Sequence, residues 1–168
     1  KKFTILLMMS IFLMFSTNLA SANNPISDDI TNHYFEDYMR EAIDLGILKG
    51  VSEGVYKPDG DVTRSEFAAL IVRTLEKMQA LPTATQAPLT FKDVKEGAWY
   101  YKEVQTATSL GIINGYPDGT FGPLKAITRQ EMAIMIERTL TAQGIEAVEA
   151  NIPFTDLKTT HPMFVTAI

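Results

Sequence analysis

Cysteine is absent from this 168-residue sequence, which excludes a disulfide framework, a thiolate zinc site, a cysteine nucleophile and a lipid-modified cysteine. Histidine is scarce, and neither His33 nor His161 stands in a catalytic or metal-binding motif. The 15 basic residues are outnumbered by 20 acidic ones and form no basic run, which argues against binding to nucleic acid or to a membrane surface. What is present, 46% hydrophobic and 21% charged residues, is typical of a globular protein.

Residues 1–22 predict a secretory signal peptide. Two lysines begin the chain, residues 3–15 are almost wholly apolar, and Ala-Ser-Ala at 20–22 matches the pattern that signal peptidase cleaves. The apolar run is shorter than the roughly 18 residues that cross a bilayer, so we expect cleavage and not a membrane anchor. Removing this segment leaves 13 basic and 20 acidic residues, a formal net charge of −7. Because position 1 is not Met, we expect the sequence to begin one residue late.

A repeat with a period of 65 residues organises most of the remaining chain. Two long blocks align without a gap. The aligned pairs are Asp28 with Asp93, Tyr34-Phe35 with Trp99-Tyr100, Leu45-Gly46-Ile47 with Leu110-Gly111-Ile112, Gly50 with Gly115, Gly54 with Gly119, Pro58 with Pro123, Thr63-Arg64 with Thr128-Arg129, Glu66 with Glu131, and Arg73-Thr74-Leu75 with Arg138-Thr139-Leu140. A third copy begins with Phe-Thr-Asp-Leu at 154–157 and stops at Ile168, so we expect the sequence to be a fragment of a longer protein.

Each complete copy predicts a helix, a loop and a second helix. In the first copy, apolar residues at helical spacing indicate helices over 34–45 and 63–78. The segment 49–62 between them is rich in Gly, Pro and Asp, as loops are. In the second copy the helices are predicted at 99–110 and 129–143. Because one helix pair buries little apolar surface alone, we expect the copies to share a core.

The sequence Thr-Arg-x-Glu occurs at 63–66 and again at 128–131, and both occurrences fit the helix capping box. In that motif the threonine hydroxyl accepts a hydrogen bond from a backbone N–H of the first turn, and the glutamate accepts one from the threonine N–H. Such a cap contributes about 1 kcal/mol. We therefore interpret the first and last residues of both motifs as helix caps: Thr63, Glu66, Thr128 and Glu131.

The capping box does not explain the arginines of the motif, Arg64 and Arg129. The N-terminus of a helix carries partial positive charge, so we do not expect a cation there to serve stability. A guanidinium beside a helix N-terminus is instead well suited to bind a carboxylate or a phosphate. We therefore predict one small anion-binding spot in each copy.

The second copy resembles the S-layer homology module at nearly every motif position. The matching segments are Phe91-x-Asp93-Val94, Trp99, Leu110-Gly111-Ile112-Ile113-x-Gly115, Asp118-Gly119-Thr120-Phe121-x-Pro123 and Ile127-Thr128-Arg129-x-Glu131. The first copy is looser, with Tyr34 at the position of Trp99. The resemblance implies modules at 26–80 and 89–145 and the truncated start of a third at 152–168.

The resemblance implies a mainly α fold of tandem helix-loop-helix modules, packed as a pseudo-threefold helical bundle. It also implies a non-catalytic anchor, secreted and held at the cell wall or S-layer of a Gram-positive bacterium. Its expected ligand is an acidic, often pyruvylated secondary cell-wall polysaccharide. No cofactor, metal, nucleic acid or membrane insertion after signal cleavage is expected.

The ligand contacts of the family correspond to six positions of this sequence: Arg64, Arg129, Trp99, Tyr34, Gly50 and Gly115. Arg129 is favoured over Arg64 because the second copy matches the motif better. For the others a structural role is the alternative, since Trp99 would suit a core and the two glycines would suit turns.

Two other classes of protein stay open. Residues 59–61, Asp-Gly-Asp, resemble the second half of an EF-hand calcium loop that would end at Glu66, but Val55 and Lys57 would then occupy ligand positions and cannot ligate. The alternative of an enzyme depends on loop aspartates, including Asp118, that could pair as in a glycosidase. The sequence contains no set of nucleophile, base and orienting group. If the whole protein degrades glycans, we expect its catalytic domain after residue 168.

Overall fold

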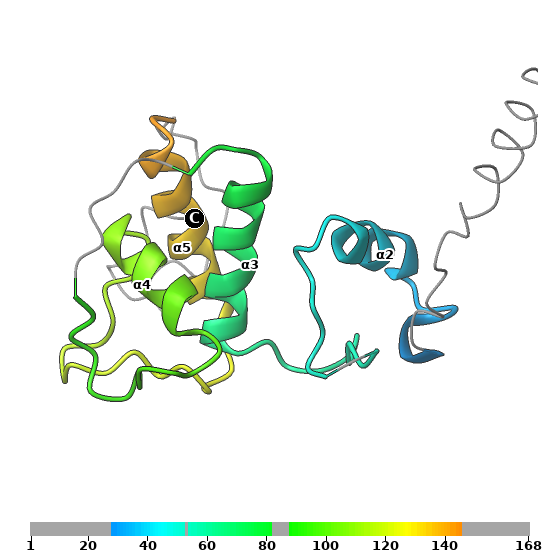
Figure 1. The fold of residues 1–168 in the computed structure, drawn as a ribbon, viewed down its shortest axis with the longest axis horizontal. Coiled ribbons are helices and arrows are strands. Elements are labelled where there is room, and N and C mark those ends of the chain that lie inside the picture. Colours follow the sequence, from blue (N-terminus) through cyan, green and yellow to red (C-terminus); the bar gives the residue numbers. More distant parts are fainter. Residues whose placement is uncertain (1–27, 53, 82–87, 146–168) are drawn as a thin grey trace, which may run out of the picture. The chain divides into compact units, whose positions relative to one another are not determined.

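The computed structural model describes residues 28–52, 54–81 and 88–145. Over these residues the chain forms a short 3-10 helix and four α-helices, joined by loops and without a strand (Figure 1). The elements are η1 (Asp28–Ile30), α2 (Glu36–Asp44), α3 (Arg64–Lys77), α4 (Tyr101–Ser109) and α5 (Arg129–Ala142). The prediction of a mainly α fold is confirmed. The predicted signal peptide and the predicted start of a third copy lie outside the described residues, so both stay predictions, as does the pseudo-threefold arrangement.

Each α-helix lies within two residues of the bounds that the sequence periodicity predicted. The small differences fall at the ends, where capping residues flank the helices. Thr63 and Met78 cap α3, and Thr128 and Gln143 cap α5. Local sequence was sufficient here because the cap residues and the apolar spacing both act within a few positions of the chain.

Internal packing divides the chain into two compact units. Among the described residues, the first comprises 28–36 together with 50–58, and the second comprises 37–49 and 59–145. This division passes through the first copy of the repeat. In the first unit, Asp29 Oδ2 accepts hydrogen bonds from the backbone N–H groups of Tyr56 and Lys57, at 2.8 and 2.9 Å, and so ties η1 to the loop.

The second copy has an aspartate with the same role as Asp29, and the comparison of the two corrects the alignment of the repeat. Asp93 accepts hydrogen bonds from the backbone N–H groups of Phe121 and Gly122, at 2.8 and 2.7 Å. The counterpart in the first copy is Asp29, and the pairing of Asp28 with Asp93 is wrong by one residue. Six residues separate Asp29 from the start of α2, whereas seven separate Asp93 from the start of α4. The first copy is therefore one residue shorter before its first helix.

The second unit has one hydrophobic core, built where α3 packs against α4 and α5 (Figure 1). Residues of both copies contribute to it: Ala68, Val72, Leu75, Val94, Tyr100, Val104, Ala107, Ile112, Ile113, Phe121 and Met135. The largest of the fully buried side chains is Phe121, whose burial stabilises the fold by about 1.5–3 kcal/mol. The expectation that the copies share a core is confirmed.

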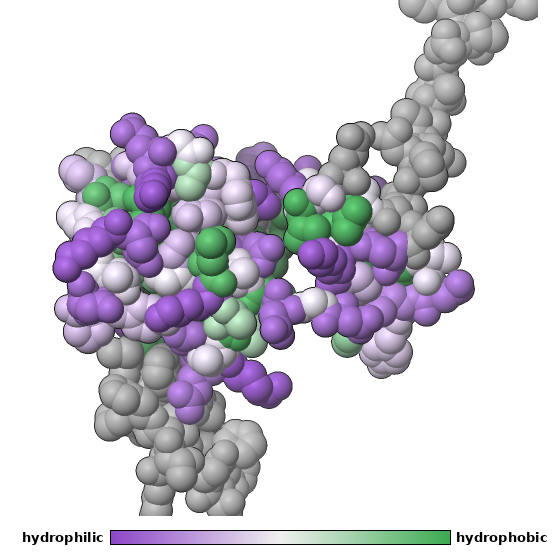
Figure 2. Space-filling view, turned by 90° about the horizontal axis from the view of Figure 1, so that it is seen from below, coloured by the Kyte–Doolittle hydropathy of each residue, from purple (hydrophilic) through white to green (hydrophobic). Residues whose placement is uncertain are grey.

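The face in view in Figure 2 is mostly hydrophilic, with hydrophobic residues in small separate groups. Two predicted ligand residues are nevertheless aromatic and exposed, since Trp99 is 56% and Tyr34 87% exposed. Among the described residues, no helix combines the length and the apolar character that crossing a membrane requires.

Candidate functional site

Both Thr-Arg-x-Glu motifs form the predicted capping boxes. The Glu66 N–H donates to Thr63 Oγ1 at 3.3 Å, and the Thr63 N–H donates to Glu66 Oε2 at 2.7 Å. The same two bonds link Glu131 and Thr128, at 3.2 and 2.9 Å. Each box fixes the start of its helix. The arginine that follows the threonine is therefore the first residue of the helix.

The N-terminus of α3 is seated on the loop of the second copy that leads to α5. The backbone N–H groups of Arg64 and Ser65 donate to the carbonyl oxygens of Lys125 and Pro123, at 2.9 and 3.1 Å. The Ser65 hydroxyl also donates to Pro123, at 2.8 Å. These contacts satisfy N–H groups that a helix start leaves without an intrahelical partner. The Thr-Arg-x-Glu motif of the first copy is thus held by hydrogen bonds to the loop of the second copy.

The side chain of Arg64 continues this contact and is only 6% exposed as a residue. Its Nε donates to the carbonyl oxygen of Phe121 at 2.7 Å, and its Nη1 pairs with Glu131 Oε1 at 2.7 Å. The guanidinium also lies 4.6 Å from the ring centre of Tyr116, a favourable cation–π geometry. The expectation that an arginine here does not serve stability is wrong for Arg64, because partners from the second copy compensate for the unfavourable helix end.

Glu131 serves the cap and the ion pair together. Its Oε1, which faces Arg64, also accepts a hydrogen bond from the Tyr116 hydroxyl at 2.8 Å. Partial burial opposes ionisation, but hydrogen bonds from Thr128 and Tyr116 and the charge of Arg64 outweigh it and hold the pKa of Glu131 below its ordinary value. Burial, together with the bond to Glu131, raises the pKa of Tyr116. At neutral pH the carboxylate is therefore charged and compensates the charge of Arg64 within the protein.

A pocket of about 410 Å³ opens beside this ion pair. Its walls come from the start of α3, the loop after α4, and α5 with its cap. The lining residues are Arg64, Ile112, Ile113, Asn114, Gly115, Tyr116, Pro117, Thr128, Glu131, Ile134, Met135 and Arg138. Of the six predicted ligand residues the pocket unites two, Arg64 and Gly115, and it includes both residues of the α5 capping box, Thr128 and Glu131.

Gly115 is required at this wall by its conformation and by the space around it. Its φ of +67° lies in the left-handed region, which residues other than glycine rarely adopt. A Cβ atom would lie 2.4 Å from a ring atom of Phe91 and 2.8 Å from the carbonyl oxygen of Thr120. The turn geometry proposed as the alternative for Gly115 therefore holds, and it coexists with a place in the pocket.

The other four predicted ligand residues are not among those that line this pocket. Arg129 is exposed on the first residue of α5, while Tyr34 and Gly50 belong to the first unit. Trp99 is more than half exposed and lies 5.9 Å from the guanidinium of Arg73, so the alternative of a core role for it is wrong. The ligand-binding roles of these four residues stay predictions.

Two further polar residues line the pocket that the Thr-Arg-x-Glu motifs did not predict, Arg138 and Asn114. With the Asn114 amide turned so that both of its groups are satisfied, Oδ1 accepts from Arg138 Nη2 at 3.2 Å and Nδ2 donates to the Ile113 carbonyl at 3.1 Å. A signal for Arg138 existed, because Arg-Thr-Leu recurs at 73–75 and 138–140 within the aligned blocks. The recurrence of an arginine on the second helix of each copy is therefore the sequence feature that indicates this residue.

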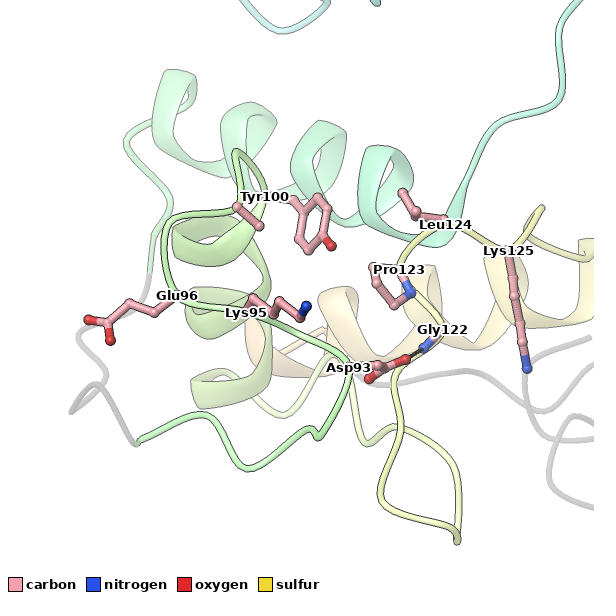
Figure 3. A pocket seen from close by; sticks show the side chains of 9 residues that line it. Asp93, Lys95, Glu96, Tyr100, Gly122, Pro123, Leu124 and Lys125 are labelled. Atoms are coloured by element: carbon pink, nitrogen blue, oxygen red, sulfur yellow. Dashed lines mark hydrogen bonds between the residues drawn. The ribbon is translucent and has the colours of Figure 1, made fainter.

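A larger pocket of about 760 Å³ lies between the start of the second copy and residues 122–125 (Figure 3). Figure 3 shows Asp93 bonded to the amide of Gly122, with Glu96 pointing away from the other side chains. Both carboxylate oxygens of Asp93 are engaged by backbone amides. Because this pocket unites none of the predicted ligand residues, the smaller one is the better candidate.

Two residues on which the calcium-binding and enzyme alternatives depended have structural roles, Asp118 in its loop and Glu66 at the start of α3. Asp118 accepts hydrogen bonds from the hydroxyl and the backbone N–H of Thr120, which lower the pKa of Asp118 and shape the loop. Glu66 belongs to the cap of α3. Over residues 28–52, 54–81 and 88–145, no three His, Asp or Glu side chains gather as a metal site would need.

The sequence profile of the S-layer homology domain matches residues 28–68 and 90–133 of the chain. These two segments make up half of its length, and the chain belongs to the S-layer homology domain family.

Three relatives show how far the similarity extends. Cell surface glycoprotein 1 of Acetivibrio thermocellus is 36% identical over 127 residues, which cover 72% of this chain and 5% of that protein. The cellulosome-anchoring protein of the same organism is 32% identical over 142 residues, 83% of this chain and 31% of that protein. An endoglucanase of Bacillus sp. strain KSM-635 is 30% identical over 143 residues, 80% of this chain and 14% of the enzyme. The chain spans less than a third of each relative.

Proposed function

We propose that this chain anchors an exported protein non-covalently to the bacterial cell envelope by binding an acidic secondary cell-wall polysaccharide. The pocket beside Arg64 carries the proposal. Two arginines and one glutamate line it, so it is a net positive site on a chain whose formal net charge is −5. Guanidinium groups recognise carboxylates and phosphates through paired hydrogen bonds, which suits an acidic sugar.

The build of the pocket also suits a sugar ring. Its volume of about 410 Å³ lies within the range of small-ligand sites. Ile112, Ile134 and Met135 supply apolar wall, while Asn114 and Tyr116 supply polar groups at the same opening. A pocket of this size holds a short acidic segment of a glycan, and the rest of the polymer stays outside.

The relatives support an envelope location. One is named a cell surface glycoprotein and another a cellulosome-anchoring protein, whereas the third is an endoglucanase. A shared segment in proteins of such different names fits a module that anchors and leaves catalysis to other domains. We therefore propose that the chain is secreted, non-catalytic in itself, without a cofactor, and located at the cell wall of a Gram-positive bacterium.

A retention assay on cell walls tests this function. The chain is incubated with purified Gram-positive cell walls, before and after chemical removal of the secondary polymer. Retention is expected on the intact walls alone. Equal retention on both preparations would contradict the polysaccharide as ligand, and no retention on either would contradict anchoring.

The role predicted for Arg129 has its own variant. Arg129→Ala is expected to weaken retention while the helical circular dichroism signal stays intact. Unchanged retention would remove Arg129 from the binding residues without affecting the proposed anchoring.

A further inference from the structure

We infer that Arg138 supplies the net positive charge by which this pocket recognises the acidic group of the glycan. The inference rests on the proposed function and assigns its charge specificity to one residue. Both arginines line the same pocket, but the structure uses their charges differently.

The charge of Arg64 is already committed within the protein. Its side chain is 7% exposed, its Nη1 pairs with Glu131 at 2.7 Å, and its Nε donates to the carbonyl oxygen of Phe121. An anion arriving beside this guanidinium would face the carboxylate of Glu131 at the same time. Like charges at short range repel, so Arg64 positions Glu131 and the wall of the pocket and offers little net attraction.

Arg138 holds a charge that no carboxylate of the described chain balances. It is half-buried on α5, two turns after Glu131, and its described hydrogen bond goes to the neutral amide of Asn114. That bond uses one of the five N–H donors of the guanidinium. Partial burial shields the charge from salt, so it attracts an incoming anion more strongly than an exposed arginine does. The net positive charge of the pocket is therefore that of Arg138.

The repeat itself supplies the comparison that supports this assignment. Arg73 occupies the position of Arg138 in the first copy. There the charge is balanced, since Arg73 Nη2 pairs with Glu103 Oε1 at 3.0 Å and the guanidinium lies near the ring of Trp99. The same residue at the same repeat position is thus neutralised in one copy and left to a ligand in the other.

The experiment uses the secondary polysaccharide released from Gram-positive walls, with its carboxylates either intact or converted to neutral methyl esters. Isothermal titration calorimetry measures the affinity of the chain for both forms. The unmodified chain is expected to bind the acidic form roughly tenfold or more tightly, as the loss of a charge-assisted hydrogen bond implies. Arg138→Gln is expected to bind both forms with the affinity of the ester.

Two further variants make the result decisive. Arg73→Gln is the matched control and is expected to keep the full preference for the acidic form. Asn114→Asp places a carboxylate beside Arg138 on an exposed residue, which copies the pairing of Arg73 with Glu103 and is expected to abolish the preference without affecting the fold.

The outcomes separate this inference from the function on which it rests. A preference that persists in both Arg138→Gln and Asn114→Asp would overturn the role of Arg138 and leave polysaccharide binding intact. An unmodified chain that binds both forms equally would also overturn it. If the unmodified chain bound neither form, the proposed function itself would fail.

Discussion

Arg64 Nη1 lies 2.7 Å from Glu131 Oε1, so the arginine of the first Thr-Arg-x-Glu motif is paired with the glutamate of the second. The two motifs are therefore not independent sites. The first supplies a cation that crosses into the second copy, and the second supplies a carboxylate that also caps α5. A helix cap in one copy is thereby coupled to the seating of a helix from the other.

This coupling predicts unequal costs for the same substitution in the two motifs. Arg64→Ala removes a buried cation and leaves Glu131 without its ion pair, so we expect a loss of about 3 kcal/mol in the free energy of unfolding. Arg129→Ala changes an exposed residue and is expected to stay within about 0.5 kcal/mol. Urea denaturation followed by circular dichroism measures both. Equal costs would mean that the pairing across the copies does not contribute to stability.

The ion pair also predicts a dependence of stability on acid. The pKa of Glu131 is held below its ordinary value in the folded chain, so its contribution is complete above the ordinary value of 4.5 and is lost as pH falls through the folded pKa. We expect Glu131→Gln to lower the free energy of unfolding at neutral pH. Below about pH 5, the variant should lose stability less steeply than the unmodified chain. Denaturation at several pH values measures this. If the free energy of unfolding fell equally with pH in the variant and in the unmodified chain, Glu131 would not be the group responsible.

Crowding at Gly115 predicts a difference between two glycines of one loop. Gly115 and Gly111 both have positive φ, at 67° and 73°, but a Cβ at Gly111 would meet nothing within 4 Å. Gly111→Ala is therefore expected to cost about 1–2 kcal/mol, from the backbone conformation alone. Gly115→Ala should cost clearly more, since Phe91 and the backbone at Thr120 must shift to make room for the Cβ. Because Gly115 lines the pocket, the variant should also weaken retention on cell walls. Thermal denaturation and wall retention of both variants check this, and similar values for the two would argue against it.

Recognition through one net charge predicts that binding to the wall weakens with salt. Raising the ionic strength from about 0.15 M to about 1 M shortens the screening length from about 8 Å to about 3 Å. We expect retention of the unmodified chain to fall over this range, and retention of Arg138→Gln to fall less. Retention that does not change with salt would favour an apolar mode of binding over a charged one.

Local structure followed from local sequence. Thr63 and Glu66 predicted a capping box, and Thr128 and Glu131 predicted another, because every atom of such a box lies within four residues of the chain. The bounds of the helices followed from apolar spacing for the same reason. The register of the repeat was less secure, since only the hydrogen bonds of Asp29 show that one residue is missing before α2.

By itself, then, the sequence determined the repeat, the helices with their caps, and the family to which the chain belongs. Only the tertiary structure decided how the charges are used. Arg64 finds its carbonyl partner Phe121 at 57 residues' distance along the chain, which no local pattern encodes. Two arginines that are equivalent in the repeat, Arg73 and Arg138, differ because Glu103 reaches one and no described carboxylate reaches the other. Electrostatic compensation depends on distance in space, so identical motifs acquire different roles once the chain has folded.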